Sequence, residues 1–252
     1  MNMKNKRRRI ETYYVKNSYI PNEINKILDI KFSETYWNKK RIVLSYYYQH
    51  NVYQFALELI KKNGINSIID VGCGVGSKLK LIYDKFPHLN YIGIDQKNAI
   101  EYCERNHNFG KWYIDDLENP QLGSAKIKGD LVISSDVIEH LNKPTTLLKY
   151  LKSVAKEDGL ILISTPERDL LRGKDCFKCP NKYHIREWNA FEFKKYIESN
   201  GFKILMHEMV FPIKITFSLK IEYLITFYSE FIKRILYRKP LKYNQLLLLK
   251  CS

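Results

Sequence analysis

The sequence has few of the features that mark secreted or membrane-spanning chains. Its 252 residues include only five cysteines, an odd and unevenly spread set that does not suit a disulfide framework. No apolar signal segment with a small-residue cleavage site follows the basic start. The best candidate for a membrane span, residues 217–236, contains five charged side chains, too many for a segment buried in lipid. We therefore expect a protein of the reducing cytoplasm without a transmembrane segment.

Acidic residues are also scarce. Lys and Arg number 42 against 27 Asp and Glu, which gives a formal net charge of +15. Such a charge attracts polyanions, so nucleic acid or peripheral contact with an anionic membrane could follow from it. The basic residues are scattered, however, apart from residues 4–9, and the composition is rich in Lys rather than Arg. Composition bias accounts for the charge as well, and a small-molecule or glycan partner is favoured.

Short apolar runs alternate with helical patterns from residue 67 onward. The runs cover residues 67–71, 91–94, 111–114, 131–134 and 160–164, each followed by a turn and usually by a helix. This alternation predicts β-α-β crossovers and a parallel, doubly wound sheet. With 45% hydrophobic residues, the chain can bury the core of one such α/β domain, which we place at residues 64–252.

Further helices are expected at both ends of this domain. Residues 39–62 have the apolar spacing of one long helix stopped by Gly64, within an N-terminal helical extension, residues 1–63, that packs on the core. Asn189 and Glu192 have the spacing of a capping box, which predicts a helix over residues 190–200 that ends at Gly201. The remaining prediction is a strand over residues 202–211, a helix over residues 217–236 within an insertion of about residues 213–240, and a strand over residues 245–251.

The most specific local signal is a glycine-rich turn between a predicted strand and a predicted helix, Asp70-Val71-Gly72-Cys73-Gly74-Val75-Gly76. Glycines let the backbone approach a ligand closely, and the helix behind them offers unpaired N–H groups. Asp95 ends the second strand, where a carboxylate can accept hydrogen bonds from two ribose hydroxyls. Together these residues predict a nucleoside pocket at the carboxyl ends of adjacent strands.

At this point the chain resembles the class I S-adenosylmethionine (SAM)-dependent methyltransferases. The Gly-x-Gly-x-Gly spacing, the acid two residues before it and the order of later motifs carry the resemblance. It implies an α/β, Rossmann-like fold whose seven-stranded, mostly parallel sheet has an antiparallel last strand and helices on both faces. It also implies these cofactor contacts: Asp70, Gly72, Gly74 and Gly76 at the methionine part, Asp95 and Gln96 at the ribose, Asp116 or its neighbour Asp115 at the adenine, and Ser135 in the fourth motif beside the methyl group.

The residues predicted near the transferred methyl group indicate which kind of acceptor the enzyme uses. An alcohol must lose its proton as it attacks, which requires a general base or a metal. Asp136, Glu139 and His140 are spaced to share one face of a short helix, and with His184 they could bind Mg²⁺. This pattern resembles metal-assisted quinone O-methyltransferases and small-RNA 2′-O-methyltransferases. We favour His140 and His184 without a metal, one of them serving as the base.

The stretch from residue 164 to residue 188 resembles a bacterial subgroup of these enzymes found among glycan and secondary-metabolite genes. It follows the fifth strand, where an acceptor must sit. Cys176 and Cys179 have the spacing of half a zinc site, but we expect free thiols because no second pair follows. The candidate acceptor contacts are Arg168, Asp169, Arg172, His184, Arg186 and Glu187.

These observations lead to one principal prediction and two alternatives. The principal prediction is an enzyme that methylates a hydroxyl on a sugar-containing, lipid-linked or other small acceptor. The first alternative is an RNA ribose 2′-O-methyltransferase, although no appended RNA-binding module is evident. The second is a SAM-binding protein without catalysis.

Overall fold

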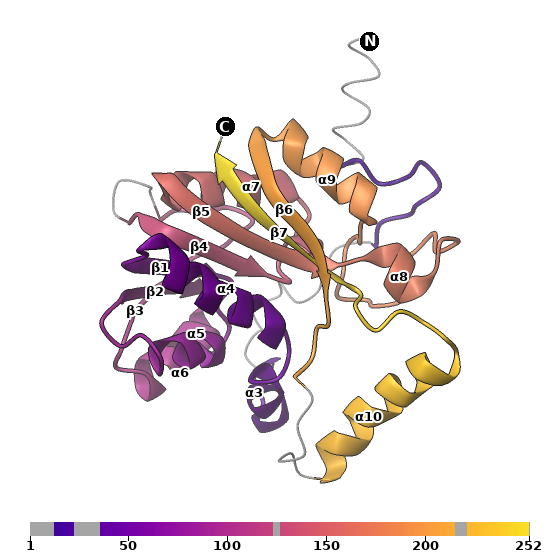
Figure 1. Cartoon of the computed structure of the whole chain (residues 1–252), viewed down its shortest axis with the longest axis horizontal. Helices are drawn as coiled ribbons and strands as arrows, with labels where there is room; N and C mark the ends of the chain where they lie inside the picture. The colour runs from indigo at the N-terminus through magenta and orange to yellow at the C-terminus, as the bar shows by residue number, and fades with distance from the viewer. Residues whose placement is uncertain (1–12, 23–35, 123–126, 215–220, 252) are drawn as a thin grey trace.

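The computed structural model describes residues 13–22, 36–122, 127–214 and 221–251. A seven-stranded sheet forms its centre, in the order β3-β2-β1-β4-β5-β7-β6 (Figure 1). Strands β1 to β5 pair in parallel, whereas β7 runs antiparallel to both β5 and β6. The predicted fold class is confirmed. The strands are β1 (Ser67–Val71), β2 (Asn90–Asp95), β3 (Lys111–Ile114), β4 (Gly129–Ser135), β5 (Ala155–Pro166), β6 (Phe202–Val210) and β7 (Asn244–Cys251).

Helices cover both faces of the sheet because its central strands are apolar on both sides. In β1, Ile68 packs in one hydrophobic cluster and its neighbour Ile69 in the other, as the two-residue period of a strand requires. The first cluster includes α4 (His50–Asn63), α5 (Ser77–Tyr83) and α6 (Lys97–Asn106). The second includes α7 (Pro144–Val154) and α9 (Ala190–Ser199).

The single helix expected over residues 39–62 is wrong, because the structure divides it into α3 (Lys39–Ser45) and α4. Between them Gln49 adopts a left-handed φ of 53°. The Gln49 N–H donates to the Pro212 carbonyl at 2.7 Å, and the Lys214 N–H donates to the Tyr47 carbonyl at 2.8 Å. Pairing with the segment after β6 therefore replaces the helical bonds at this point. The break directs Tyr48 and Gln49 toward the carboxyl edge of the sheet.

The C-terminal elements agree more closely with the sequence. The predicted capping box is confirmed, since Asn189 and Glu192 each accept from the other's backbone N–H at the start of α9. A short α8 (Arg168–Arg172) follows β5, and α10 (Ile221–Leu236) lies within the residues for which a helix was predicted, 217–236. The expected start of that helix at residue 217 lies outside the described residues. Among the helices that are described, none is both long and apolar enough to cross a membrane.

Candidate functional site

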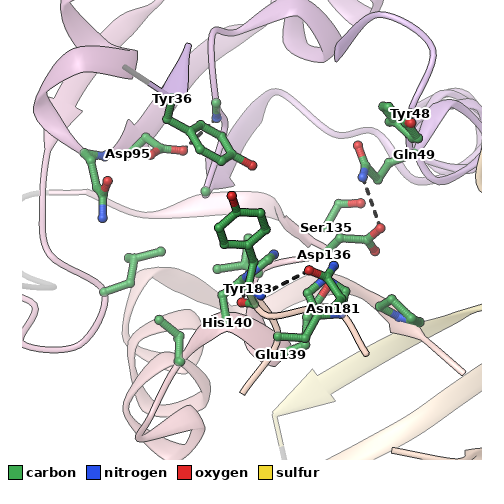
Figure 2. Close-up of a pocket in the computed structure, with 18 of the residues that line it drawn as sticks. Tyr36, Tyr48, Gln49, Asp95, Ser135, Asp136, Glu139, His140, Asn181 and Tyr183 are labelled. Carbon is green, nitrogen blue, oxygen red and sulfur yellow. Dashed lines mark hydrogen bonds between the residues drawn. The ribbon is translucent and has the colours of Figure 1, made fainter. Parts of the chain in front are cut away.

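A pocket of about 380 Å³ opens at the carboxyl edge of the sheet. This volume lies in the range of small-molecule sites. Its wall includes Gly72 and Gly74 from the turn after β1, Asp95 at the end of β2 and Ser135 at the end of β4. Figure 2 shows Asp95 on one side and Ser135 on the other. The carboxyl ends of β1, β2 and β4 therefore bring together residues of the glycine-rich turn, Asp95 and Ser135 of the fourth motif, all predicted as cofactor contacts.

Asp95 is anchored to the glycine-rich turn. Its Oδ2 accepts from the Gly74 N–H at 2.7 Å, and its Oδ1 accepts from the Gln96 N–H at 2.7 Å. Burial raises the pKa of Asp95, and the two backbone donors oppose that rise. Each carboxylate oxygen retains another lone pair for a ligand hydroxyl. The Asp95 carboxylate is therefore held in place to accept two more hydrogen bonds.

Gly72 allows this turn to meet the end of β4. Its φ is 83°, and a Cβ added there would lie 2.3 Å from Val137 Cγ2. Only glycine combines that backbone conformation with so close an approach.

Two predicted cofactor residues lie behind the pocket wall rather than on it. Asp70 is fully buried, and both its oxygens lie within 3.0 Å of the Tyr53 hydroxyl. Burial raises the pKa of Asp70 to about 7. Gly76 is the N-cap residue of α5 with φ 70°, and a Cβ there would lie 2.9 Å from the Trp112 ring. Both residues support the turn from behind.

The structure separates the two acids that competed for the adenine. Asp115 is buried and accepts three backbone hydrogen bonds, from Asp116, Gln121 and Leu122. Asp116 lines the pocket, as Gln96 does. Asp115 therefore shapes the loop, and Asp116 is the better candidate for a ligand contact.

Aromatic residues that the sequence reasoning missed also line the pocket. Tyr36 and Trp37 precede α3, and the Trp37 ring lies against Gly74. The Arg41 guanidinium stacks on the Tyr36 ring, 3.8 Å from its centroid. Tyr36 and Tyr183 reach toward one another across the pocket (Figure 2). Two adjacent aromatics before a predicted helix were the available signal.

Lys78 is a second residue that the motif reasoning missed. It lies on the first turn of α5, lines the pocket and is only 7% exposed. Burial lowers the pKa of its ammonium, and the charges of Asp70 and Asp136 oppose that effect. Among the described residues, none forms a hydrogen bond or ion pair with this ammonium. A buried cation facing a cavity calls for an anion on the ligand.

His184 lines the same pocket, and a hydrogen bond to Glu187, which lies outside the pocket, orients its ring. Its Nδ1 lies 2.6 Å from the Glu187 Oε1, and Arg172 bonds to both oxygens of Glu187 at 3.0 and 3.1 Å. Burial alone would raise the pKa of Glu187, but the bonds from His184 and Arg172 lower it to about 2. An ionised Glu187 holds the proton of His184 on Nδ1, which leaves Nε2 as the basic atom.

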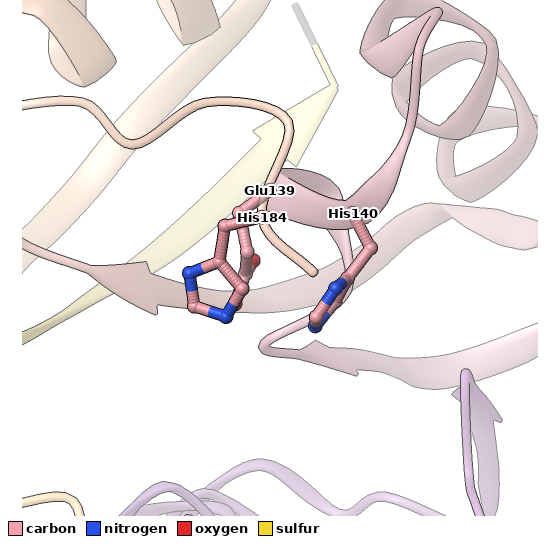
Figure 3. A group of neighbouring side chains, drawn as sticks. All are labelled: Glu139, His140 and His184. Atoms are coloured by element: carbon pink, nitrogen blue, oxygen red, sulfur yellow. The ribbon is translucent and has the colours of Figure 1, made fainter. Parts of the chain in front are cut away.

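His140 and Glu139 lie beside His184. The two imidazole rings pack edge to face with their centroids 4.7 Å apart, and Figure 3 shows them projecting to the same side. Burial, aided by His184, lowers the pKa of His140 to about 3, so this ring is neutral. Glu139 is fully buried; its Oε2 accepts from Thr165, whereas its Oε1 has no partner among the described residues. Burial raises the pKa of Glu139 well above its ordinary value.

These side chains fit a metal ion better than the four-residue set expected from the sequence. One ligand atom each from Glu139, His140 and His184 lies within 4.8 Å of the others. Asp136 is outside this trio, because its left-handed φ of 54° turns it toward Gln49, Ser164 and Asn244, which all donate to it. The expected shared helical face is therefore wrong. Two imidazoles and one carboxylate suit Zn²⁺ or Mn²⁺ more than Mg²⁺.

Most of the residues expected to contact the acceptor instead form hydrogen bonds or ion pairs with other parts of the protein. Of the six, only His184 lines the pocket. Arg168 is fully buried and bonds to Glu192 and Asp169. Arg186 donates to the carbonyls of residues 141 and 142. The expectation is therefore wrong for the other five, which hold the segment after β5 in place.

Replacing Arg168 with methionine should lower the free energy of unfolding by about 3–5 kcal/mol, because the buried Glu192 carboxylate would lose its ion-pair partner. Chemical denaturation measures this directly. The matched control is Lys194→Met in the exposed Lys194–Glu198 pair, which should change stability by less than about 1 kcal/mol. Equal effects in the two variants would contradict the structural role of Arg168.

Comparison with known proteins identifies the family to which this pocket belongs. The family model described as "Methyltransferase domain" matches residues 38–207. This chain belongs to the class I SAM-dependent methyltransferases. The matched region includes the glycine-rich turn, Asp95, Asp116 and the His140–His184 pair.

Relatives of this methyltransferase include several curated proteins. A probable SAM-dependent methyltransferase of Mycolicibacterium smegmatis is 27% identical over 68% of this chain and 61% of its own length. A malonyl-[acyl-carrier protein] O-methyltransferase of Halalkalibacterium halodurans is 31% identical over 41% of this chain and 40% of its own. The matched regions thus span less than two thirds of these relatives. The solved plantazolicin methyltransferase BpumL, in complex with SAH, matches 99% of both chains with a TM-score of 0.61 and 15% identity, which shows a shared fold.

SAM is accordingly the cofactor of this methyltransferase. The residues present fit it: a carboxylate for the ribose at Asp95, an acidic pocket residue at Asp116 and a cation for the methionine end at Lys78.

Proposed function

We propose that this protein is an O-methyltransferase that transfers the SAM methyl group to a hydroxyl of a small acceptor, with His184 as the general base. The observation that carries the proposal is that one pocket contains both the Gly72–Asp95 cofactor wall and a histidine oriented by a buried carboxylate. A histidine so oriented suits an acceptor that must lose a proton, whereas a pocket for an already ionised acceptor needs no base.

The proposed reaction is a direct displacement. The acceptor oxygen attacks the methyl carbon, the C–O bond forms as the C–S bond breaks, and S-adenosylhomocysteine (SAH) leaves. His184 Nε2 takes the hydroxyl proton, while Glu187 stabilises the resulting imidazolium and Arg172 keeps Glu187 ionised. The pocket walls supply alignment and exclude water, which is most of what a methyl transfer needs.

A metal ion would add a different means of activating the hydroxyl. Glu139, His140 and His184 would hold it, and it would lower the pKa of a bound hydroxyl. The ligand atoms of a second trio, Cys179, His184 and Glu187, also lie within 4.8 Å of one another, but Glu187 already forms an ion pair with Arg172.

The proposed acceptor is small, or presents a small group such as a sugar or the end of a lipid-linked chain. A cavity of about 380 Å³ shared with SAM leaves room for a limited group, and Tyr36 and Tyr183 offer flat surfaces for a ring. Relatives named as malonyl-carrier and ubiquinone O-methyltransferases support oxygen as the target atom. Incubation with isotopically labelled SAM and cell extracts should yield a labelled product stable to mild base. Absence of any labelled product would favour SAM binding without catalysis, and label in RNA would favour ribose methylation.

Lys78 should bind the methionine carboxylate of SAM. Lys78→Met is expected to weaken SAH binding about 10–100-fold, the cost of one charge-assisted hydrogen bond. Affinity for 5′-methylthioadenosine, which lacks the amino-acid part, should be unchanged. Calorimetry with both ligands makes the test.

Lys80→Met is the control, because Lys80 points away to an exposed pair with Asp84. Equal losses for the two ligands in Lys78→Met would show that Lys78 serves only to stabilise the fold.

A further inference from the structure

The C-terminal end of α10 presents apolar side chains to solvent. Ile232, Ile235 and Leu236 are 49%, 52% and 72% exposed, and their i, i+3, i+4 spacing places them on one face. Tyr237 follows at 73% exposure. Figure 1 shows α10 standing away from the sheet, beyond α8. A soluble surface rarely gathers four large apolar residues in so short a segment.

This orientation is fixed by the opposite face of the helix. Arg234 is only 3% exposed and donates to the carbonyls of Leu170 in α8 and Pro240. Its guanidinium also stacks on Tyr243, 4.0 Å from the ring centroid. The centroids of the Phe231 and Phe211 rings lie 6.0 Å apart. Because these contacts anchor the inner face, the exposed apolar face cannot turn inward without breaking them.

The charge around this face indicates its partner. The segment from residue 231 to residue 243 contains five basic residues and no acidic residue. Lys233, Arg238, Lys239 and Lys242 are exposed there. An apolar helix end followed by a basic segment matches an anionic bilayer surface, where the apolar side chains enter the interface and the cations meet lipid phosphates.

We propose that the end of α10 docks the protein peripherally on anionic membranes, through an apolar face formed by Ile232, Ile235, Leu236 and Tyr237. Leu170, which Arg234 contacts, lies in the helix that follows β5, and Pro166 at the end of β5 lines the pocket. The inner face of α10 is thus linked through α8 to the end of β5, one residue of which lines the pocket.

Sedimentation with sucrose-loaded vesicles tests the docking surface. The full chain should bind vesicles of phosphatidylcholine with phosphatidylserine at low salt, and bind pure phosphatidylcholine at least tenfold more weakly. Ile235→Ser with Leu236→Ser should weaken anionic binding at least tenfold. Arg238→Ser with Lys239→Ser should weaken it about 25-fold, since each cation near such a surface contributes about fivefold.

Matched controls come from another part of the surface. Phe191 in α9 is 70% exposed, and Lys61 in α4 is exposed, so Phe191→Ser with Lys61→Ser should leave binding unchanged. No binding to anionic vesicles, or equal loss in the control, would overturn the proposal. Concentration-dependent dimerisation that Leu236→Ser abolishes would overturn it as well, by assigning the face to a second copy of the chain. SAH affinity, measured in parallel, tests the proposed function separately, because docking does not require it.

Discussion

His184→Ala is expected to lower kcat by about 10²–10⁴-fold while SAM affinity changes little. General-base catalysis contributes on that scale, and His184 lines the pocket without belonging to the Gly72–Asp95 wall proposed for the cofactor. Single-turnover kinetics with the acceptor, together with calorimetry for SAM, separate the two quantities. A parallel loss in both would mean that His184 shapes the cofactor site instead.

His207→Ala is the matched control, because this histidine lies on β6 and bonds to Gln245 in the adjacent strand. It should retain full activity. Glu187→Gln should reduce kcat less than His184→Ala and should shift the pH profile, because a neutral amide orients the ring but stabilises the imidazolium poorly. Activity that disappears on chelation and returns with Zn²⁺ or Mn²⁺ would instead assign hydroxyl activation to a metal held by Glu139, His140 and His184.

The fold could be predicted from the sequence because the signals are local and redundant. The five apolar runs of the parallel strands fall at or within the strand bounds of the structure, and the glycine-rich turn fixes where β1 ends. The capping box of α9 depends on two residues three positions apart. The α3–α4 break could not be predicted, since it is caused by pairing of Tyr48 with Ile213, far away in the sequence.

Some residues of the candidate site could likewise be predicted from the sequence, and others could not. Asp95 ends a strand beside a glycine-rich turn, so its position follows from topology. The choice between Asp115 and Asp116 depends on which side chain the following loop captures, and no periodicity encodes that. Arg168 has the charge of a ligand contact in the sequence, yet the fold pairs it with Glu192 on α9. Charged residues near a site are therefore ambiguous until their partners are known.

Asp95→Ala should weaken SAM binding by a hundredfold or more. The carboxylate would accept from both ribose hydroxyls, and hydrogen bonds to a charged group are worth about 1.5–3 kcal/mol each. The effect is larger than on a surface, because Asp95 is only partly exposed and the ribose hydroxyls would lose their acceptors inside a pocket. Calorimetry with SAM and SAH gives the affinity.

Asp95 also accepts from the Gly74 N–H, so a loss of affinity must be separated from a loss of fold. Asp130→Asn is the matched control. Its carboxylate accepts from the backbone N–H groups of Asn66 and Ser67 at the opposite, amino edge of the sheet. That variant should be less stable in thermal melts and bind SAM normally. If Asp95→Ala melts like wild type and still binds SAM with unchanged affinity, the ribose is not held by this carboxylate, and the assignment of the Gly72–Asp95 wall to the cofactor fails with it.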